Sequence, residues 1–332
     1  QKNVRNAMNT IPLIFNERQI NHTVLGGGEK PEKVLMPVTC LILNRSEKQY
    51  RDRILENLLH NGFESIISIE AHGKNYNLDS LTKQYPMVKF IVPLEDVTQG
   101  DLLNMGISMA QTPYVLVLQD NLCAENVPFS SLLAKKLIEK EQFCVCPRLQ
   151  SSTLQILPVR FSPTVKKSVF QVESSLAISE GAKTLYPADF AGFYDRERFI
   201  KIGGADYTIT SAYWQKLDLF FRAWLWGEKV TLETAFTLTY SGNVPSDDQT
   251  IDASYLNFYL KNLLPIYKSD HAEIPRSSFF AFHSRSSHGL GESLAMFKEA
   301  RRWTAENKYR FKLDAASLIE DWGKENETHE SV

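Results

Sequence analysis

Between residues 34 and 119, short apolar runs alternate with segments whose apolar residues recur at helical spacing. The first run, VLMPVTCLIL at residues 34–43, is typical of a strand buried on both faces of a sheet. Three further strand-like runs follow, at residues 65–70, 88–93 and 114–119. Three amphipathic segments separate the runs, at residues 46–62, 78–86 and 99–111. Strands and helices that alternate through short links predict β-α-β units, and therefore a mostly parallel central sheet flanked by helices.

Length and composition are those of a globular protein. The chain has 332 residues, of which 43% are hydrophobic and 23% charged, so it can bury a sizeable core. Its formal net charge of −2 gives no global indication of a nucleic-acid partner. The four cysteines lack the paired spacing of a zinc site, which favours free thiols in a reducing compartment. Because no apolar run reaches the roughly 20 residues of a membrane span and no secretory signal is visible, we expect a cytoplasmic protein.

The rest of the pattern divides the chain into four parts. Residues 24–33, VLGGGEKPEK, have the glycines, proline and charges of a flexible linker, and residues 151–185 are predicted to be extended and loop structure. After residue 323 the chain is polar, which favours disorder. The expected parts are a lead-in and linker at 1–33, an α/β domain at 34–245, a helical extension packed on it at 246–323, and a disordered tail at 324–332.

A polar cluster follows the strand at residues 114–119. Gln119, Asp120 and Asn121 come directly after the apolar residues Tyr114 to Leu118. In open α/β sheets, ligands bind beyond the carboxyl ends of the strands, so this cluster is a candidate site. The structural alternative is that Asp120 caps the turn after the strand, because Asp bonds readily to its own backbone.

Two longer stretches carry ordered motifs. The helix before that polar cluster contains Asn104-Met105-Gly106-Ile107-Ser108-Met109-Ala110, which has the form N-x-G-I-x-x-A. The second stretch is DFAGFYDRERFIKIGGADYT followed by WQKLDLFFRAWLWGEKV. It contains Gly203-Gly204-Ala205-Asp206, and then Leu217-Asp218-Leu219 with Arg222 and Gly227.

Taken together, residues 35–240 resemble the family 2-type glycosyltransferases of the GT-A fold. The resemblance implies an α/β nucleotide-diphospho-sugar transferase fold that transfers a sugar from a nucleotide-sugar donor to a hydroxyl of a glycan, lipid or protein. Such enzymes use D-x-D carboxylates to hold Mn²⁺ or Mg²⁺, because the cation neutralises charge on the leaving diphosphate. An acid on the acceptor side serves as the general base.

The resemblance also implies roles for residues of this chain. Seven residues are predicted to bind the donor: Asn44, Arg45, Glu70, Asn104, Gln119, Asp120 and Asn121. Asp120 is the predicted metal ligand, together with His283 or His288 from a late loop. Asp218 and Asp206 are the predicted catalytic bases. The structural alternative for Asp218 is an ion pair with Arg222, four residues later on the same helix.

The chain departs from the family at both chemical positions. Gln119 and Asn121 stand where the family has the D-x-D acids, and amides bring no charge to a cation. Gln215 and Lys216 replace the usual Glu-Asp of the acceptor side, and a lysine is no base at neutral pH unless it is strongly desolvated. Metal-independent binding of the donor therefore stays open beside metal-dependent binding.

Two hypotheses of function follow. The first is a glycosyltransferase, and the second is a catalytically degenerate domain of the same fold that acts as a binding or partner protein. A nucleotidyltransferase is a weaker third hypothesis, because the turn LNRSEK after the first strand contains no glycine.

Aromatic and basic residues suggest further contacts. Residues 298–312 interleave six basic residues with Trp303, Tyr309 and Phe311, so this segment could rest on an anionic membrane surface or form a solvated helix face packed by its aromatics. The tryptophans near residue 220 could stack on a sugar ring or fill the core. A homodimer also stays open.

Overall fold

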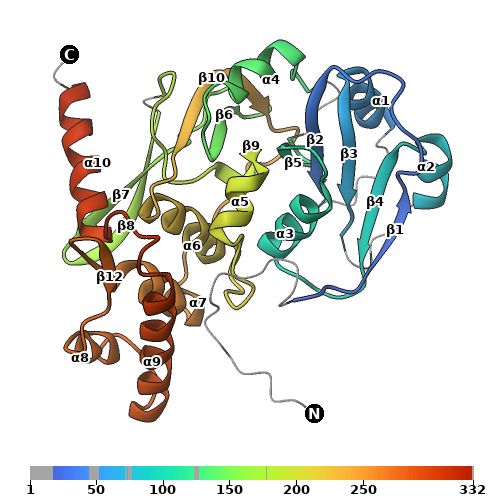
Figure 1. Ribbon diagram of the computed structural model, residues 1–332. Helices are drawn as coiled ribbons and strands as arrows, with labels where there is room; N and C mark the ends of the chain where they lie inside the picture. Colours follow the sequence, from blue (N-terminus) through green and yellow to red (C-terminus); the bar gives the residue numbers. More distant parts are fainter. Residues whose placement is uncertain are drawn as a thin grey trace.

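The computed structural model describes residues 18–44, 52–71, 73, 77–122, 127–176 and 178–330. Its centre is an eight-stranded sheet in the order β1-β4-β3-β2-β5-β9-β6-β10, flanked by helices (Figure 1). The strands are β1 (His22–Gly26), β2 (Met36–Leu43), β3 (Phe63–Ile69), β4 (Val88–Pro93), β5 (Tyr114–Gln119), β6 (Cys144–Gln150), β9 (Gly192–Asp195) and β10 (Val230–Thr239). Strands β2 to β5 are mutually parallel, as is the pair β6–β10, so the expected α/β fold with a mostly parallel sheet is confirmed.

Helices connect these strands, and the first three lie within the predicted segments 46–62, 78–86 and 99–111. They are α1 (Asp52–His60), α2 (Leu78–Gln84), α3 (Gln99–Met109), α4 (Ser131–Ile138), α5 (Arg196–Ile202) and α6 (Ala212–Leu225). The Ser46 start expected for the first helix, and Arg45 beside it, lie outside the described residues. Helix α3 begins at a capping box, in which the Thr98 side chain accepts from the Asp101 backbone N–H and the Asp101 carboxylate accepts from that of Thr98.

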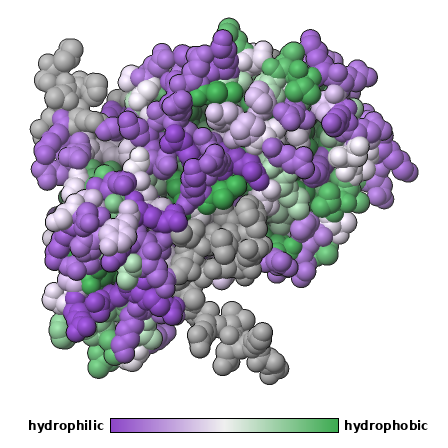
Figure 2. Space-filling view, viewed as in Figure 1, coloured by the Kyte–Doolittle hydropathy of each residue, from purple (hydrophilic) through white to green (hydrophobic). Residues whose placement is uncertain are grey.

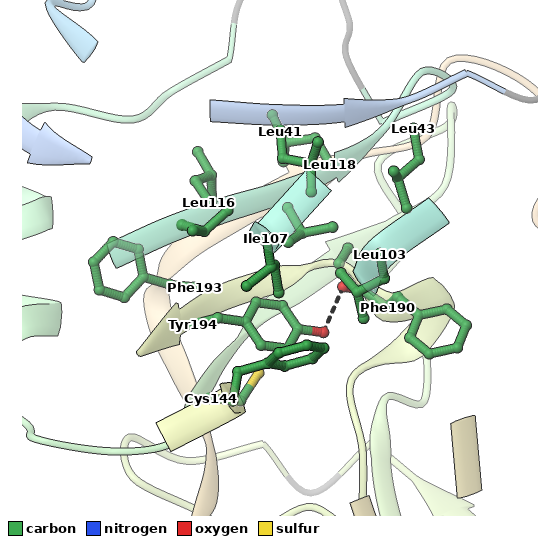
Figure 3. Close-up of a cluster of buried hydrophobic side chains, with 14 of the residues drawn as sticks. Leu41, Leu43, Leu103, Ile107, Leu116, Leu118, Cys144, Phe190, Phe193 and Tyr194 are labelled. Atoms are coloured by element: carbon green, nitrogen blue, oxygen red, sulfur yellow. Dashed lines mark hydrogen bonds between the residues drawn. The ribbon is translucent and has the colours of Figure 1, made fainter. Parts of the chain in front are cut away.

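Part of the core lies between α3 and the sheet. Figure 3 shows Leu103 and Ile107 of α3 beside leucines of β2 and β5, with Tyr194 of β9 below them. The Tyr194 hydroxyl, fully buried here, donates to the Phe190 carbonyl at 2.7 Å, which satisfies its polar atom inside the core. Gly106 lies directly on Leu41 of β2, and a Cβ at this position would overlap the leucine side chain. The glycine of the N-x-G-I motif therefore lets the helix approach the sheet.

Two parts expected to be irregular form strands. Within the lead-in, β1 pairs antiparallel with β4 along the sheet edge, where Gly26 and Gly27 both adopt positive φ. In the region 151–185, β7 (Arg160–Lys166) and β8 (Val169–Ser175) pair as an antiparallel hairpin. Strand β1 depends on the edge of β4 for its backbone partners, whereas β7 and β8 pair with each other, across a turn at Lys167 and Ser168 where both residues adopt positive φ.

The C-terminal extension begins with α7 (Ala253–Phe258), which continues as the π-helical turn η2 (Tyr259–Leu263). It goes on through β11 (Ile266–Lys268), β12 (His271–Glu273), α8 (Ser278–His283), α9 (Leu290–Asn307) and α10 (Ala315–Glu330). Helix α10 covers most of the tail that was expected to be disordered. Trp322 anchors it, since its ring meets the Trp224 ring edge-on at 4.9 Å and its Nε1 donates to Ser162 at 3.2 Å.

The close approach of α3 to β2 predicts that Gly106→Ala is destabilising. A new Cβ must push Leu41 or the helix aside, and overpacking of this kind costs about 1–3 kcal/mol. Urea denaturation measures the loss. Gly291→Ala in α9 is the matched control, because a Cβ there meets nothing within 4 Å. That variant keeps wild-type stability or gains slightly. Equal stability of the two variants would contradict the packing described here.

Candidate functional site

A buried polar corner lies where β2 and β3 end. The Asn44 Nδ2 donates to the Ser68 Oγ at 2.8 Å and to the Glu70 Oε1 at 3.3 Å. The Ser68 hydroxyl donates to the same Glu70 oxygen at 2.9 Å. The three side chains are at most 4% exposed. Two of the predicted donor-binding residues, Asn44 and Glu70, are thus held together at the carboxyl ends of neighbouring parallel strands.

The end of β5 completes this corner. The Gln119 Nε2 donates to the Asp189 carbonyl at 2.8 Å, and the Gln119 side chain is fully buried. The backbone N–H of Asp120 donates to the Leu43 carbonyl at 3.1 Å, which carries the β2–β5 pairing one residue further. The Asn121 carbonyl accepts from both the N–H and the hydroxyl of Ser241. The corner is therefore tied to the loop that follows β10.

A pocket of about 430 Å³ lies beside the corner. Its walls are the short helix η1 (Ala188–Phe190), the beginning of α6 and residues 245–252. Asp189 and Phe190 have φ values of 56° and 58°, in the left-handed region that side chains rarely adopt. Strained backbone of this kind concentrates at functional sites. Asp189 also links the pocket to the polar corner. It lines the pocket, and its carbonyl accepts the hydrogen bond from Gln119 of the corner.

Lys216 forms one wall of this pocket. Its Nζ lies 2.8 Å from each carboxylate oxygen of Asp247 and 4.8 Å from the centre of the Tyr186 ring. The lysine side chain is 2% exposed, whereas that of Asp247 is 36% exposed. The pKa of the neighbouring Tyr213 is raised to about 12, chiefly by burial, so the Tyr213 hydroxyl stays protonated at neutral pH. The pocket thus offers one buried cation whose counter-ion comes from a surface loop.

Two amides hold helix α3 against the segment that leads into α6. Asn104 makes two hydrogen bonds with the Ala205 backbone: its Nδ2 donates to the carbonyl at 2.8 Å, and its Oδ1 accepts from the N–H at 2.9 Å. Gln215 accepts from the Gly100 N–H and donates to the Asp206 carbonyl, both at 2.9 Å. Asn104 is predicted to bind the donor, and in this structure its amide is fully engaged with backbone.

Asp206 and Asp218 lie in a buried ion-pair cluster. Asp206 pairs with Lys261 at 2.6 Å, and Asp218 pairs with Arg222 at 2.8 Å and accepts from Asn262 at 2.7 Å. Both carboxylates are fully buried. Two anions and two cations balance, which is the condition for burying charge at tolerable cost. The geometry thus supports the structural alternative for Asp218, and the assignment of either residue as a base stays a prediction.

The two predicted metal-ligating histidines are held elsewhere. His283 of α8 contacts the Ser293 hydroxyl at 3.0 Å, and His288 pairs with Glu292 at 3.0 Å. Figure 1 shows α8 and α9 at the lower left, well apart from β2 and β3 at the upper right. The structure therefore does not bring either histidine to Asp120. In the described ranges no group of three or more His, Cys, Asp or Glu side chains could hold a metal ion.

The aromatic segments prove to be core elements. Trp214 and Trp224 of α6 are at most 6% exposed, and within residues 298–312 Trp303 and Phe311 are 1% exposed. Tyr309 alone of that segment's three aromatics is exposed. Figure 2 shows the lobe of α8 and α9 as mostly hydrophilic, with small apolar areas. No helix in the described part of the chain has the length and apolar character needed to cross a membrane.

Sequence reasoning did not identify Asp189 or Asp247. Asp189 becomes recognisable only through its left-handed backbone and its contact with Gln119. Asp247 lies in the polar stretch PSDDQT, where nothing local separates it from Asp248. Lys216 was recognised only as a departure from the family pattern, and its place on the pocket wall required the fold.

Comparison with solved structures supports the assignment of fold. The chain is similar to the crystal structure of GalNAc-T7 with UDP, GalNAc and Mn²⁺, with a TM-score of 0.55 and 11% sequence identity. The match covers 88% of this chain and 58% of the other, so this chain spans little more than half the length of that protein. No protein-family model matches the chain, and no curated protein sequence does. The likeness shows the fold, which is that of the GT-A glycosyltransferases.

The ion-pair cluster predicts a loss of stability in acid. Burial alone raises the pKa of Asp206, but the charge and hydrogen bond of Lys261 outweigh it, so the pKa lies below its ordinary value of 3.8. The ionised form therefore stabilises the fold above pH 3.8, and this contribution is lost as the pH falls through the lowered value.

Urea denaturation at a series of pH values tests this. Asp206→Asn is expected to be less stable than wild type at pH 7 and to lose less stability between pH 5 and 2. Asp96→Asn, at an exposed loop position, should keep the wild-type profile. If the stability of Asp206→Asn fell with pH in parallel with that of wild type, the Asp206–Lys261 pair would not be the source of the acid destabilisation.

Proposed function

We propose that the protein is a glycosyltransferase that transfers a sugar from a nucleotide-sugar donor to a hydroxyl acceptor. The observation that carries the proposal is the buried polar corner of Asn44, Glu70 and Asp120, adjoining a pocket on a GT-A sheet. In open α/β sheets, ligands bind at this edge. GalNAc-T7, which has a similar fold, was crystallised with UDP and GalNAc, and this supports a nucleotide-sugar as the ligand class.

In this proposal, different residues of the corner bind different parts of the donor. Glu70 accepts hydrogen bonds from Asn44 and Ser68, so a fixed carboxylate can receive a ribose hydroxyl or a base N–H. Asp120 and Asn121, at the end of the neighbouring strand, stand closer to where the phosphates would lie. The pocket beyond Asp189 has room for the sugar and the acceptor hydroxyl, because cavities of this volume accommodate small molecules.

The donor set fits poorly with a bound Mn²⁺ or Mg²⁺. Protein sites for these hard cations rely on charged oxygen ligands. In the described part of the corner, Asp120 stands between the amides Gln119 and Asn121, and Gln119 is engaged with Asp189. We therefore propose that the donor binds without a strong requirement for a metal.

A second candidate is a degenerate glycosyltransferase domain that binds a nucleotide-sugar or a partner protein without turnover. The observation that favours it concerns Gln215 and Lys216, which stand where the resembled family has acids on the acceptor side. Gln215 hydrogen-bonds the Gly100 N–H and the Asp206 carbonyl, and Lys216 is paired with Asp247. The acceptor side thus keeps the shape of the site while its usual base is absent.

Calorimetric titration with UDP, GDP and their sugars tests the proposal. We expect one nucleotide to bind with EDTA present, and Mn²⁺ to change its affinity less than tenfold. Glu70→Gln or Asp120→Ala should weaken binding roughly tenfold or more, because hydrogen bonds to charged groups contribute about 1.5–3 kcal/mol. Glu64→Gln is the matched control, since Glu64 lies on the same strand β3 but is exposed.

The outcomes separate the candidates. Binding together with transfer or slow hydrolysis of the donor supports the glycosyltransferase. Binding without turnover supports the degenerate domain. If no nucleotide binds, or if Glu64→Gln weakens binding as much as Glu70→Gln, the corner is not a donor site.

A further inference from the structure

We infer that Lys216 binds the diphosphate of the donor. When no donor is bound, the Asp247 carboxylate takes the place of the diphosphate as the counter-ion of Lys216. The inference rests on the proposed function, because it names the group that meets the donor's charge. It is carried by the position of one buried cation on a pocket wall, paired with a carboxylate from an exposed loop.

The charges around the pocket single out this pair. Among the residues that line the pocket, Lys216 is the one cation. Of the three loop carboxylates, Asp248 accepts from the N–H and hydroxyl of Thr250, and Asp252 caps α7 by accepting from the N–H groups of Ser254 and Tyr255. Both are occupied by hydrogen bonds with residues two or three positions later in the chain. Asp247 instead directs its two oxygens at Lys216.

The two partners differ in how firmly they are held. Lys216 belongs to helix α6, is 2% exposed, and lies against the rings of Tyr186 and Tyr213. Asp247 lies in residues 241–252, a stretch without helix or strand that is exposed throughout. The stretch is anchored near its ends, by Ser241 to Asn121 and by the Thr250 carbonyl to the Trp214 Nε1 at 2.7 Å. The carboxylate can therefore leave the lysine without unfolding the helix.

A diphosphate reproduces what the carboxylate supplies. A buried ammonium requires a counter-ion, since an uncompensated charge in the interior is strongly destabilising. Asp247 provides two oxygens at 2.8 Å, and phosphate oxygens accept from lysine in the same way. A diphosphate that carries more charge than one carboxylate can displace it, and the exposed loop returns Asp247 to water.

The location suits the donor's needs. Asp189 lines this pocket together with Lys216 and also accepts a hydrogen bond from Gln119, so it links the pocket to the strand end where the resembled family places its metal. With amides at the two acid positions there, little protein charge remains to hold a cation. Lys216 would supply positive charge to the diphosphate from the α6 side of the pocket.

Calorimetry with pyrophosphate and with UDP, in EDTA, tests the inference. Asp247→Asn removes the competing carboxylate from an exposed position, and we expect both ligands to bind about tenfold more tightly, because the binding-competent state becomes the resting state. Lys216→Gln should weaken both at least tenfold. Asp248→Asn is the matched control: it removes the same charge one residue away, and binding should change less than about twofold.

Thermal melting checks that Lys216→Gln is folded. Lys216→Arg keeps the positive charge and should therefore retain the binding that Lys216→Gln loses. Unchanged affinity in Asp247→Asn overturns the inference whatever the lysine variants do. Equal gains in Asp247→Asn and Asp248→Asn also overturn it, because they indicate a general charge effect.

Titrations with further ligands show which kind of anion Lys216 binds. They also distinguish failure of this inference from failure of the proposed function. If Asp247→Asn tightens binding of glucuronate but not of pyrophosphate, the lysine serves an acidic acceptor sugar and the diphosphate assignment fails. If UDP binds wild type, Asp247→Asn and Lys216→Gln equally, this inference fails while the proposed function stands. If pyrophosphate follows the expected pattern but no nucleotide-sugar binds better than pyrophosphate, the oxyanion site stands and the proposed function fails.

Discussion

The site depends on the contact between α3 and the segment that leads into α6, which two buried amides hold. Asn104 takes both polar groups of the Ala205 backbone, and Gln215 bridges the Gly100 N–H and the Asp206 carbonyl. A Cβ at Gly100 would overlap the Gln215 side chain, so the glycine is required for the approach. Each amide both donates and accepts, and all four bonds are buried, where an unmet polar group would cost about 1–3 kcal/mol.

This contact explains the arrangement of charge on the acceptor side. With Gln215 turned to the backbone of α3, the next residue, Lys216, faces the pocket and takes Asp247 as its counter-ion. Two and six residues further along α6, Asp218 and Arg222 pair with each other, and Asp218 also contacts Lys261 and Asn262 of the π-helical turn η2. The helix thus presents one charge to the pocket and uses the others to fix the C-terminal extension.

The sequence could predict the fold because its signals were local. The apolar runs at residues 34–43 and 114–119 form central parallel strands, and the stops of the intervening helices follow from nearby residues. The family resemblance assigned Asn44 and Glu70 to the same donor, and the structure brings their side chains within 3.3 Å at the ends of neighbouring parallel strands. Strand β1 could not be predicted in this way, because its stability comes from the edge of β4.

The candidate site was less predictable because partner choice is not local. The helical spacing of Asp218 and Arg222 suggested a pair, but nothing near them indicated Lys261, which arrives from a different helix. The late histidines were expected in a loop, but His283 ends helix α8, and only the path of α8 and α9 shows that both histidines bond within the extension. Asp247 and Asp248 are neighbours of the same type, and the fold alone decides which one meets a cation.

The amides at positions 119 and 215, where the resembled family has acids, are more than a loss of charge. Gln119 donates to the Asp189 carbonyl, and Gln215 donates to the Asp206 carbonyl. An ionised carboxylate has no proton to donate, so an acid at either position would face a buried carbonyl with no hydrogen bond between them. The Gln119 bond also secures a residue with left-handed backbone on the pocket wall. The amides and the local backbone are therefore mutually adapted, and restoring one acid would disturb the pocket before it restored a metal site. A site built in this way needs its positive charge from elsewhere, and Lys216 is the cation that the pocket contains.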